Sequence, residues 1–341
     1  MGEMKHPPRQ GRRLRRIEPE PKPPPLPPLA RSARGQEAFC GAEDTCRCSF
    51  IALIGAPNVG KSTLVNALVG SKVAIVSHKV QTTRSPLRGI ATVGRAQLVF
   101  VDTPGIFAPR RRLDRAMVTS AWAGAADADV VGMIVDARQG LDAETEAVLA
   151  RLAELARPTI LLINKIDLVE KPALLQLARE ANRSIRFTAT FMVSALTGDG
   201  VADVRDWLAS QASAGPWHYP EDQITDAPLR QLAAEITREK LYLRLHQELP
   251  YQSTVETEQW QRLKDGSVRI EQTIYVQRDS QRKIVLGKGG RTIKAIGSDA
   301  RREIAEMVET SVHLSLFVKV RERWSEERDR YRAMGLEFAR E

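Results

Sequence analysis

Gly55-Ala56-Pro57-Asn58-Val59-Gly60-Lys61-Ser62-Thr63 is the stretch that decides the fold of this chain. It follows an apolar run at residues 50–54 that predicts a buried strand, and it precedes residues 64–69, which predict a helix. A glycine-bounded loop between a strand and a helix that starts with Lys-Ser is the pattern of a phosphate-binding loop. The backbone N–H groups of such a loop, together with the helix N-terminus, attract phosphate. We therefore expect the whole stretch to bind a nucleotide, with Lys61 on the β and γ oxygens and the Ser62 hydroxyl on Mg²⁺.

Length and composition allow two domains and indicate a polyanionic partner. The chain has 341 residues, of which 43% are apolar, and this is enough for two domains with their own cores. The formal net charge of +9 and the pI of about 9.6 fit RNA or an anionic membrane surface as a partner. No run approaches the ~18 apolar residues of a membrane span, so we expect a soluble or peripheral protein.

From residue 50 onward, apolar strands alternate with helical segments. This alternation is typical of an α/β domain with a mostly parallel sheet and helices on both faces. The expected strands cover residues 50–54, 87–93, 97–101, 130–135, 159–163 and 191–193, and the expected helices cover residues 64–69, 141–155, 173–183 and 201–212.

Changes in composition mark the boundaries of the domains. Residues 1–47 are rich in proline and arginine and predict a disordered, dispensable tail, because such a segment cannot bury a core. The tail leaves other roles open: a ligand for proline-binding domains, an RNA-contacting arm, an organelle transit peptide or an over-long translation start. Residues 48–213 form the expected nucleotide-binding domain, residues 214–228 an inter-domain linker, and residues 229–341 a second domain.

The second domain follows a different pattern. Its expected elements are a helix at 229–247, strands at 253–260 and 267–276, a short helical segment, a helix at 291–308 and a strand at 312–320. This order predicts an α+β domain with a mainly antiparallel sheet. The loop Gly287-Lys288-Gly289-Gly290 joins the two later helical segments.

That GXXG loop is a candidate RNA contact. Beside a three-stranded sheet, a GXXG loop clamps the backbone of about four nucleotides. Small residues allow a close approach to phosphates, and Lys288, Arg291 and Lys294 add positive charge. We expect residues 287–290 together with Arg291 and Lys294 to bind RNA.

Two motifs complete the phosphate side of the nucleotide site. Asp102-Thr103-Pro104-Gly105 lies at the C-terminal end of an expected strand, where α/β folds place their sites. We expect Asp102 to hold Mg²⁺ through water and the Gly105 N–H to face a γ-phosphate. Thr82 and Thr83 lie in a polar stretch before the next strand, and one of their hydroxyls should complete the Mg²⁺ shell; we expect Thr83. The expected catalytic residues are Lys61, Thr83, Asp102 and Gly105.

A third motif predicts that the base is guanine. In Asn164-Lys165-Ile166-Asp167, the Asp167 carboxylate can accept both N–H groups on the Watson–Crick edge of guanine, and adenine would leave it unpaired. Lys165 can lie over the base, and Asn164 can tie this loop to the phosphate loop. Ser194-Ala195-Leu196 can offer a backbone N–H to guanine O6. Five elements in this order indicate a Mg²⁺-dependent GTPase that binds GTP and GDP.

Two positions refine the expected reaction. Ras-type GTPases carry a Gln after the Asp-x-x-Gly motif to orient the attacking water, whereas this chain has Ile106, which cannot do so. Asn58 occupies the position that ligates K⁺ in potassium-activated GTPases. It either holds K⁺ or only stabilises the loop, and we expect the K⁺ role.

Taken together, the motifs resemble those of the Era GTPase family. They are Gly-Ala-Pro-Asn-Val-Gly-Lys-Ser at 55–62, Gln-Thr-Thr-Arg at 81–84, Asp-Thr-Pro-Gly at 102–105, Asn-Lys-Ile-Asp at 164–167, Tyr-Pro-Glu-Asp at 219–222, Leu-Pro-Tyr at 249–251 and Gly-Lys-Gly-Gly at 287–290. The resemblance implies an α/β P-loop GTPase domain followed by an α+β type II KH domain. It also implies a monomer that binds the 3′ end of small-subunit (16S) ribosomal RNA during 30S assembly. The implied location is the cytoplasm, with peripheral association with the inner membrane.

Other interpretations stay open at this point. One is a membrane-surface signalling GTPase that couples growth to the cell cycle, which would have no use for the GXXG loop. Another is a tRNA-modifying GTPase, which would need a cofactor site or a catalytic cysteine. The tail at 1–47 departs from the family pattern, so the natural start site and organelle targeting also stay open.

Overall fold

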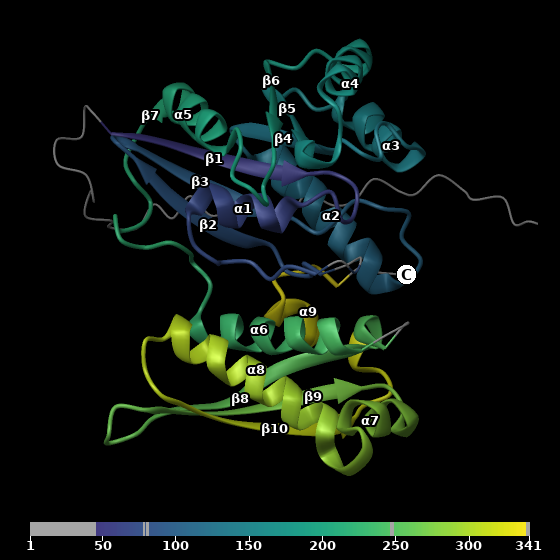
Figure 1. Ribbon diagram of the computed structural model, residues 1–341, viewed down its shortest axis with the longest axis vertical. Helices are drawn as coiled ribbons and strands as arrows, with labels where there is room; N and C mark the ends of the chain where they lie inside the picture. Colours follow the sequence, from purple (N-terminus) through teal and green to yellow (C-terminus); the bar gives the residue numbers. More distant parts are fainter. Residues whose placement is uncertain (1–45, 78, 80–81, 246–248, 339–341) are drawn as a thin grey trace, which may run out of the picture.

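The structure is a computed structural model that describes residues 46–77, 79, 82–245 and 249–338. Two domains pack against each other, one built around a large sheet and one around a smaller sheet (Figure 1). Residues 1–45 of the expected tail, Gln81 of the Gln-Thr-Thr-Arg motif and the expected helix end at 246–247 lie outside the described residues.

The first domain contains a seven-stranded sheet with strand order β2-β3-β1-β4-β5-β6, and β7 pairs with the start of β1. All pairs are parallel except β2 with β3 and β7 with β1. The elements in chain order are β1 (Arg47–Ile54), α1 (Lys61–Val69), β2 (Leu87–Val93), β3 (Ala96–Asp102), α2 (Arg112–Asp127), β4 (Val130–Asp136), α3 (Ala143–Leu152), β5 (Thr159–Asn164), α4 (Lys171–Ser184), β6 (Ala189–Val193), α5 (Val201–Gln211) and β7 (Ser213–Ala214).

Both faces of this sheet are buried. Successive side chains of a strand point to opposite faces, and β1 accordingly sends Ile51 and Leu53 into the core beneath α1 and α5. Its Ala52 and Ile54 enter the core beneath α2, α3 and α4. The expected α/β architecture is confirmed.

Helix α2 was not among the expected helices. Its segment carries few large apolar side chains, so its helical periodicity is weak. The Asp114 carboxylate accepts the N–H groups of Arg110 (3.1 Å) and Arg111 (3.0 Å) and so stabilises the start of the helix.

The segment between the domains lies along the edge of the first sheet. Trp217 is buried, and its indole N–H donates to the backbone oxygen of Arg95 at 3.2 Å. Thr225 forms an isolated bridge with Gly89 of β2. The carboxylate of Asp226 pairs with Arg88 at 2.8 Å. The expected linker is therefore bound to the first domain over most of its length.

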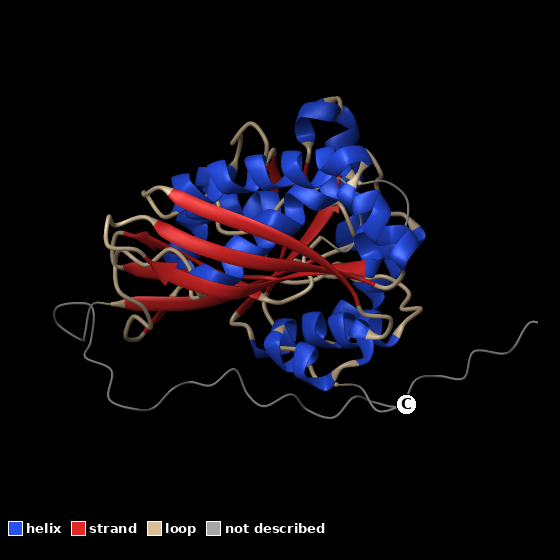
Figure 2. Ribbon diagram, turned by 90° about the horizontal axis from the view of Figure 1, so that it is seen from below, coloured by secondary structure: helices blue, strands red, loops and turns tan. Residues whose placement is uncertain are grey.

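The second domain has a three-stranded sheet of order β10-β9-β8. Its elements are α6 (Leu229–Arg244), β8 (Ser253–Arg262), β9 (Val268–Val276), α7 (Asp279–Leu286), α8 (Arg291–Met307), β10 (Val312–Val320) and α9 (Arg328–Ala333). Helices α6 and α8 cover one face of the sheet, and the three long strands are open on the other face (Figure 2).

The expectation of a mainly antiparallel second sheet was wrong. β8 and β9 are antiparallel, but β10 runs parallel to β9 over nine residue pairs. Two helices, α7 and α8, connect β9 to β10. Such a helical crossover returns the chain to the same end of the sheet, which makes the next strand parallel.

The C-terminal segment connects the two domains. Trp324 and Tyr331 are fully buried against Leu113 and Met117 of α2. The β9 residue Tyr275 belongs to the same apolar cluster. The last helix therefore packs between the second sheet and the helix that follows the Asp102–Gly105 motif.

Candidate functional site

A pocket of about 520 Å³ opens at the carboxyl ends of the parallel strands of the first domain. In open α/β sheets this edge is where ligands bind. The pocket wall combines the loop before α1, Gly105, the loop after β5 and the loop after β6. The fold thus brings together all the motifs that the sequence assigned to one nucleotide.

The backbone of the loop before α1 has a conformation that requires glycine at position 60. Gly60 has φ of 100°, and a Cβ there would lie 2.3 Å from the Asn164 side-chain nitrogen, so only glycine fits. α1 begins at Lys61, whose ammonium is buried and donates to the backbone oxygens of Gly55 (3.1 Å) and Ala56 (2.8 Å). Burial lowers the pKa of Lys61 to about 8, although the Asp102 carboxylate opposes this.

Three oxygen-bearing side chains converge beside Lys61. The Ser62 hydroxyl lies 2.7 Å from Asp102 Oδ2 and 2.9 Å from the Thr83 hydroxyl, which donates to the same carboxylate at 3.1 Å. The other oxygen of Asp102, Oδ1, is buried and has no partner among the described residues. Hard oxygen ligands are what Mg²⁺ prefers, so these residues fit that ion. Burial raises the pKa of Asp102, while Ser62, Lys61 and Thr83 lower it.

Of the two adjacent threonines, the structure places Thr83 at this cluster. The Thr82 hydroxyl instead donates to the backbone oxygen of Lys79 at 2.8 Å. The choice of Thr83 over Thr82 as an oxygen ligand therefore has a geometric reason.

The Asp102–Gly105 loop packs directly on the phosphate loop. The Thr103 hydroxyl donates to Leu53 O at 2.6 Å, and the Ile106 N–H donates to Gly55 O at 3.1 Å. A Cβ on Gly105 would lie 3.0 Å from the Cα of Pro57, so the close approach needs glycine. Ile106 is buried in the apolar core under α2, and its hydrocarbon side chain has no polar atom that could orient a water.

The loop after β5 is tied to both neighbouring loops. Asn164 is fully buried; its amide donates to Val59 O at 2.8 Å and accepts from the Ala195 N–H at 3.0 Å. The Asp167 carboxylate accepts from the Ser194 hydroxyl at 2.6 Å. These contacts hold the Asp167 carboxylate at the pocket wall, as recognition of guanine requires.

Sequence reasoning missed Asp136. This residue ends β4 and is buried, and its carboxylate pairs with the Lys165 ammonium at 2.6 Å. Lys165 also donates to Asn58 O at 2.7 Å, so its stem is held across the pocket. An acidic residue at the carboxyl end of the third predicted parallel strand was the available signal. Seven further residues that the sequence did not predict also line the pocket: Ile75, Val76, Ser77, Lys79, Arg138, Gln139 and Leu168.

The GXXG loop lies in the second domain, between α7 and α8. Lys288, Gly289, Arg291 and Lys294 are exposed, and Gly287 and Gly290 are partly buried. The Arg291 side chain donates to the backbone oxygen of Lys288 at 3.2 Å, which holds the Arg291 guanidinium against the loop. This arrangement presents backbone and positive charge to solvent at the start of a long helix.

Two family models match the chain in the corresponding regions. Residues 50–165 match the model described as a 50S ribosome-binding GTPase, and residues 248–325 match the KH domain. The fold and the pocket define a P-loop GTPase with a C-terminal KH domain.

Relatives identify the family more closely. A GTPase Era of Afipia carboxidovorans is 68% identical over 86% of this chain and 96% of its own length. A GTPase Era of Bradyrhizobium sp. strain BTAi1 is 64% identical over 90% of this chain and 99% of its own. This chain belongs to the Era GTPase family.

Solved structures agree with this assignment. A crystal structure of Era in complex with MgGDPNP and nucleotides 1506–1542 of 16S ribosomal RNA superposes with a TM-score of 0.81 at 34% identity. It covers 85% of this chain and 99% of its own. A single-residue variant of Aquifex aeolicus Era bound to GDP·AlF4⁻ also superposes with a TM-score of 0.81 at 34% identity, over 85% of this chain and 99% of its own.

Proposed function

We propose that this GTPase binds the 3′ end of small-subunit ribosomal RNA through its KH domain and assists assembly of the 30S subunit. The observation that carries the proposal is the exposed GXXG loop with Lys288, Arg291 and Lys294 around it. A related Era, 34% identical, has been crystallised with MgGDPNP and nucleotides of 16S ribosomal RNA. Positive charge around a backbone-clamping loop suits single-stranded RNA.

On the phosphate side, the backbone N–H groups of residues 58–63 and the Lys61 ammonium bind the phosphates of GTP or GDP. The Gly105 N–H faces the γ-phosphate, so loss of that phosphate releases the loop. Ser62, Thr83 and Asp102 hold Mg²⁺. When bound, that ion neutralises charge on the transferred phosphate.

On the base side, Asp167 accepts the two N–H groups of guanine and Lys165 covers the ring. In the part of the chain that the structure describes, the Ser194 N–H donates to Asp199 O and the Ala195 N–H donates to Asn164 Oδ1. Of these three N–H groups, the Leu196 N–H is therefore the one available to guanine O6. Adenine would leave the Asp167 carboxylate without its two donors, so the site rejects that base.

Three further parts of the proposal rest on resemblance to known GTPases: the K⁺ site on potassium-activated GTPases, and the monomeric state and the location on the Era family. Asn58 lies at the mouth of the pocket and holds a K⁺ ion that stimulates hydrolysis. The protein works as a cytoplasmic monomer with peripheral contact with the inner membrane. Within the described ranges, no helix has the length and apolar character needed to cross a membrane.

Charge reversal at the GXXG loop tests the RNA role. In the double variant Lys288→Glu/Arg291→Glu, two exposed cations near the loop become anions. We expect affinity for the ribosomal RNA 3′ end to fall at least ~10-fold at moderate salt, because phosphate contacts are lost and repulsion is added. The plot of log affinity against log salt concentration should become less steep by about 1.4, because two phosphate contacts are lost and each contributes about 0.7 for single strands. Affinity for GDP should be unchanged.

Arg301→Glu/Arg302→Glu is the matched control. These two arginines are exposed on the same helix α8, about 15 Å further along it. The control makes the same change in net charge and should alter RNA affinity less than ~3-fold, since its screened charges lie beyond a Debye length of about 8–10 Å. If the loop variant kept full RNA affinity, the GXXG loop would be only a connection between helices and the proposed function would fail.

A further inference from the structure

The segment that carries Thr83 is anchored in the KH domain. The Arg84 side chain is buried there and donates to the backbone oxygens of Ser253 (2.8 Å) and Pro250 (3.2 Å). It also donates to the Tyr242 hydroxyl at 2.9 Å. Arg84 is the residue directly after Thr83, so one side of Thr83 is fixed by the second domain.

The other side of Thr83 is held by Arg238. This arginine belongs to helix α6 of the KH domain and is fully buried. It donates to the backbone oxygen of Thr82, and its Nε donates to the Glu235 carboxylate at 2.9 Å. Glu235 thereby orients the guanidinium toward the first domain.

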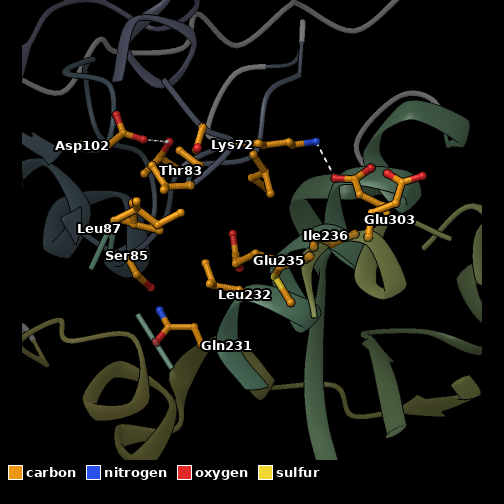
Figure 3. Close-up of a pocket in the computed structure, with 17 residues that line it drawn as sticks. Lys72, Thr83, Ser85, Leu87, Asp102, Gln231, Leu232, Glu235, Ile236 and Glu303 are labelled. Carbon is orange, nitrogen blue, oxygen red and sulfur yellow. Dashed lines mark hydrogen bonds and ion pairs between the residues drawn. The ribbon is translucent and has the colours of Figure 1, made fainter. Parts of the chain in front are cut away.

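The Thr83 side chain itself has little packing support from the KH domain. A cavity of about 310 Å³ lies between Thr83 and Asp102 on one wall and Glu235 and Ile236 of α6 on the other (Figure 3). Figure 3 shows the Thr83–Asp102 contact at the edge of this space. Because the space is not filled by side chains, the flanking anchors at Thr82 and Arg84 determine where the Thr83 hydroxyl lies.

We propose that Arg238 is a positioning residue of the GTPase site: by holding the Thr82 carbonyl, the KH domain fixes the Thr83 hydroxyl beside Ser62 and Asp102. The inference rests on the proposed role of Thr83 as a Mg²⁺ ligand. It means that the nucleotide site is completed by a residue of the RNA-binding domain, 156 positions away in sequence.

Loss of this contact should act on Mg²⁺ and hydrolysis but not on the base. A hydrogen bond to a charged group contributes a net factor of about 10 to 100 in an equilibrium. Without it, the segment around Thr83 is free to shift into the cavity, and one oxygen ligand is no longer preorganised. Asp167, Asn164 and Lys61 do not touch this segment in the described contacts, so their hold on GDP should persist.

The test compares three variants with the wild type. Arg238→Met removes the donors but keeps a long apolar stem, and Arg238→Lys restores a cation that can reach the Thr82 carbonyl. Arg244→Met is the matched control, because Arg244 lies on the same helix and pairs only with Asp299 of its own domain in the described contacts. The measurements are the Mg²⁺ concentration for half-maximal GTP binding, kcat, GDP affinity in EDTA, and amide hydrogen exchange at Thr83 and Arg84 without nucleotide.

For Arg238→Met we expect a ~10-fold higher Mg²⁺ requirement and a ~10-fold lower kcat. Amide exchange at Thr83 and Arg84 should be faster, and GDP affinity in EDTA should stay within twofold of wild type. Arg238→Lys should recover part of each effect, and Arg244→Met should match wild type. If Arg238→Met fails to fold, Glu235→Gln, which loosens Arg238 without removing it, should move the same measurements in the same direction.

Two outcomes separate this inference from the proposed function. An active, Mg²⁺-dependent wild type with wild-type values in Arg238→Met and Glu235→Gln would overturn the positioning role alone. A wild type whose GTP binding does not respond to Mg²⁺ would overturn the proposed site itself.

Discussion

Replacing Asn164 by alanine is expected to weaken both the fold and nucleotide binding. The Asn164 amide is 1% exposed and bridges Val59 O at 2.8 Å and the Ala195 N–H at 3.0 Å. Alanine leaves both of these backbone groups buried without a partner. Each unsatisfied buried group costs about 1–3 kcal/mol, so the free energy of unfolding should fall by about 2–6 kcal/mol.

Part of that loss should appear as weaker binding, since Asn164 ties the phosphate loop to the base-reading loops. We expect GDP affinity to fall at least ~10-fold, which corresponds to about 1.4 kcal/mol. Denaturant unfolding of the nucleotide-free protein and titration with GDP measure the two effects.

Asn182→Ala is the matched control for this prediction. Asn182 lies in the same domain but is exposed, and its amide donates to Ala178 O at 2.8 Å on the surface of α4. The control should change the free energy of unfolding by no more than about 0.5 kcal/mol. If Asn164→Ala behaved like Asn182→Ala in both assays, the bridge between the loops would have no energetic role and our reasoning about the site would be refuted.

Three further predictions concern the nucleotide. The pKa of Lys61 is about 8, and bound phosphate favours the charged form of this side chain. GDP affinity should therefore be independent of pH below pH 7 and fall by up to about tenfold between pH 8 and pH 9. An affinity that stays constant up to pH 9 in titrations would contradict this. Asp167→Asn should weaken GTP binding and shift the binding preference toward xanthosine triphosphate, because the new side-chain amide places an N–H donor opposite the N–H donors of guanine. Unchanged GTP affinity in a titration would remove Asp167 from the site. Hydrolysis should be faster in K⁺ than in Na⁺, and equal rates at matched ionic strength would exclude a K⁺ role for Asn58.

The sequence alone determined the class of fold and most of the nucleotide site. Apolar runs of five or six residues alternating with helical segments require a parallel sheet covered on both faces, and the motifs each follow a strand. Parallel strands bring their carboxyl ends to one edge, so Lys61, Asp102 and Asp167 had to meet there. The glycine positions and the Lys-Ser pair carry their chemistry locally, which is why local patterns could find them.

Only the tertiary structure decided how the two domains contact each other around Thr82, Thr83 and Arg84. Arg84 reaches Ser253 across 169 positions, and Arg238 reaches Thr82 across 156. Asp136 holds Lys165 from a different strand, and β10 pairs parallel to β9 after a helical crossover. Hydrophobic periodicity and short motifs depend on neighbours within about 18 residues, whereas these contacts depend on the path of the whole chain. A buried arginine in one domain and a backbone carbonyl in another leave no periodic signal, because each becomes the other's partner only when the two domains pack.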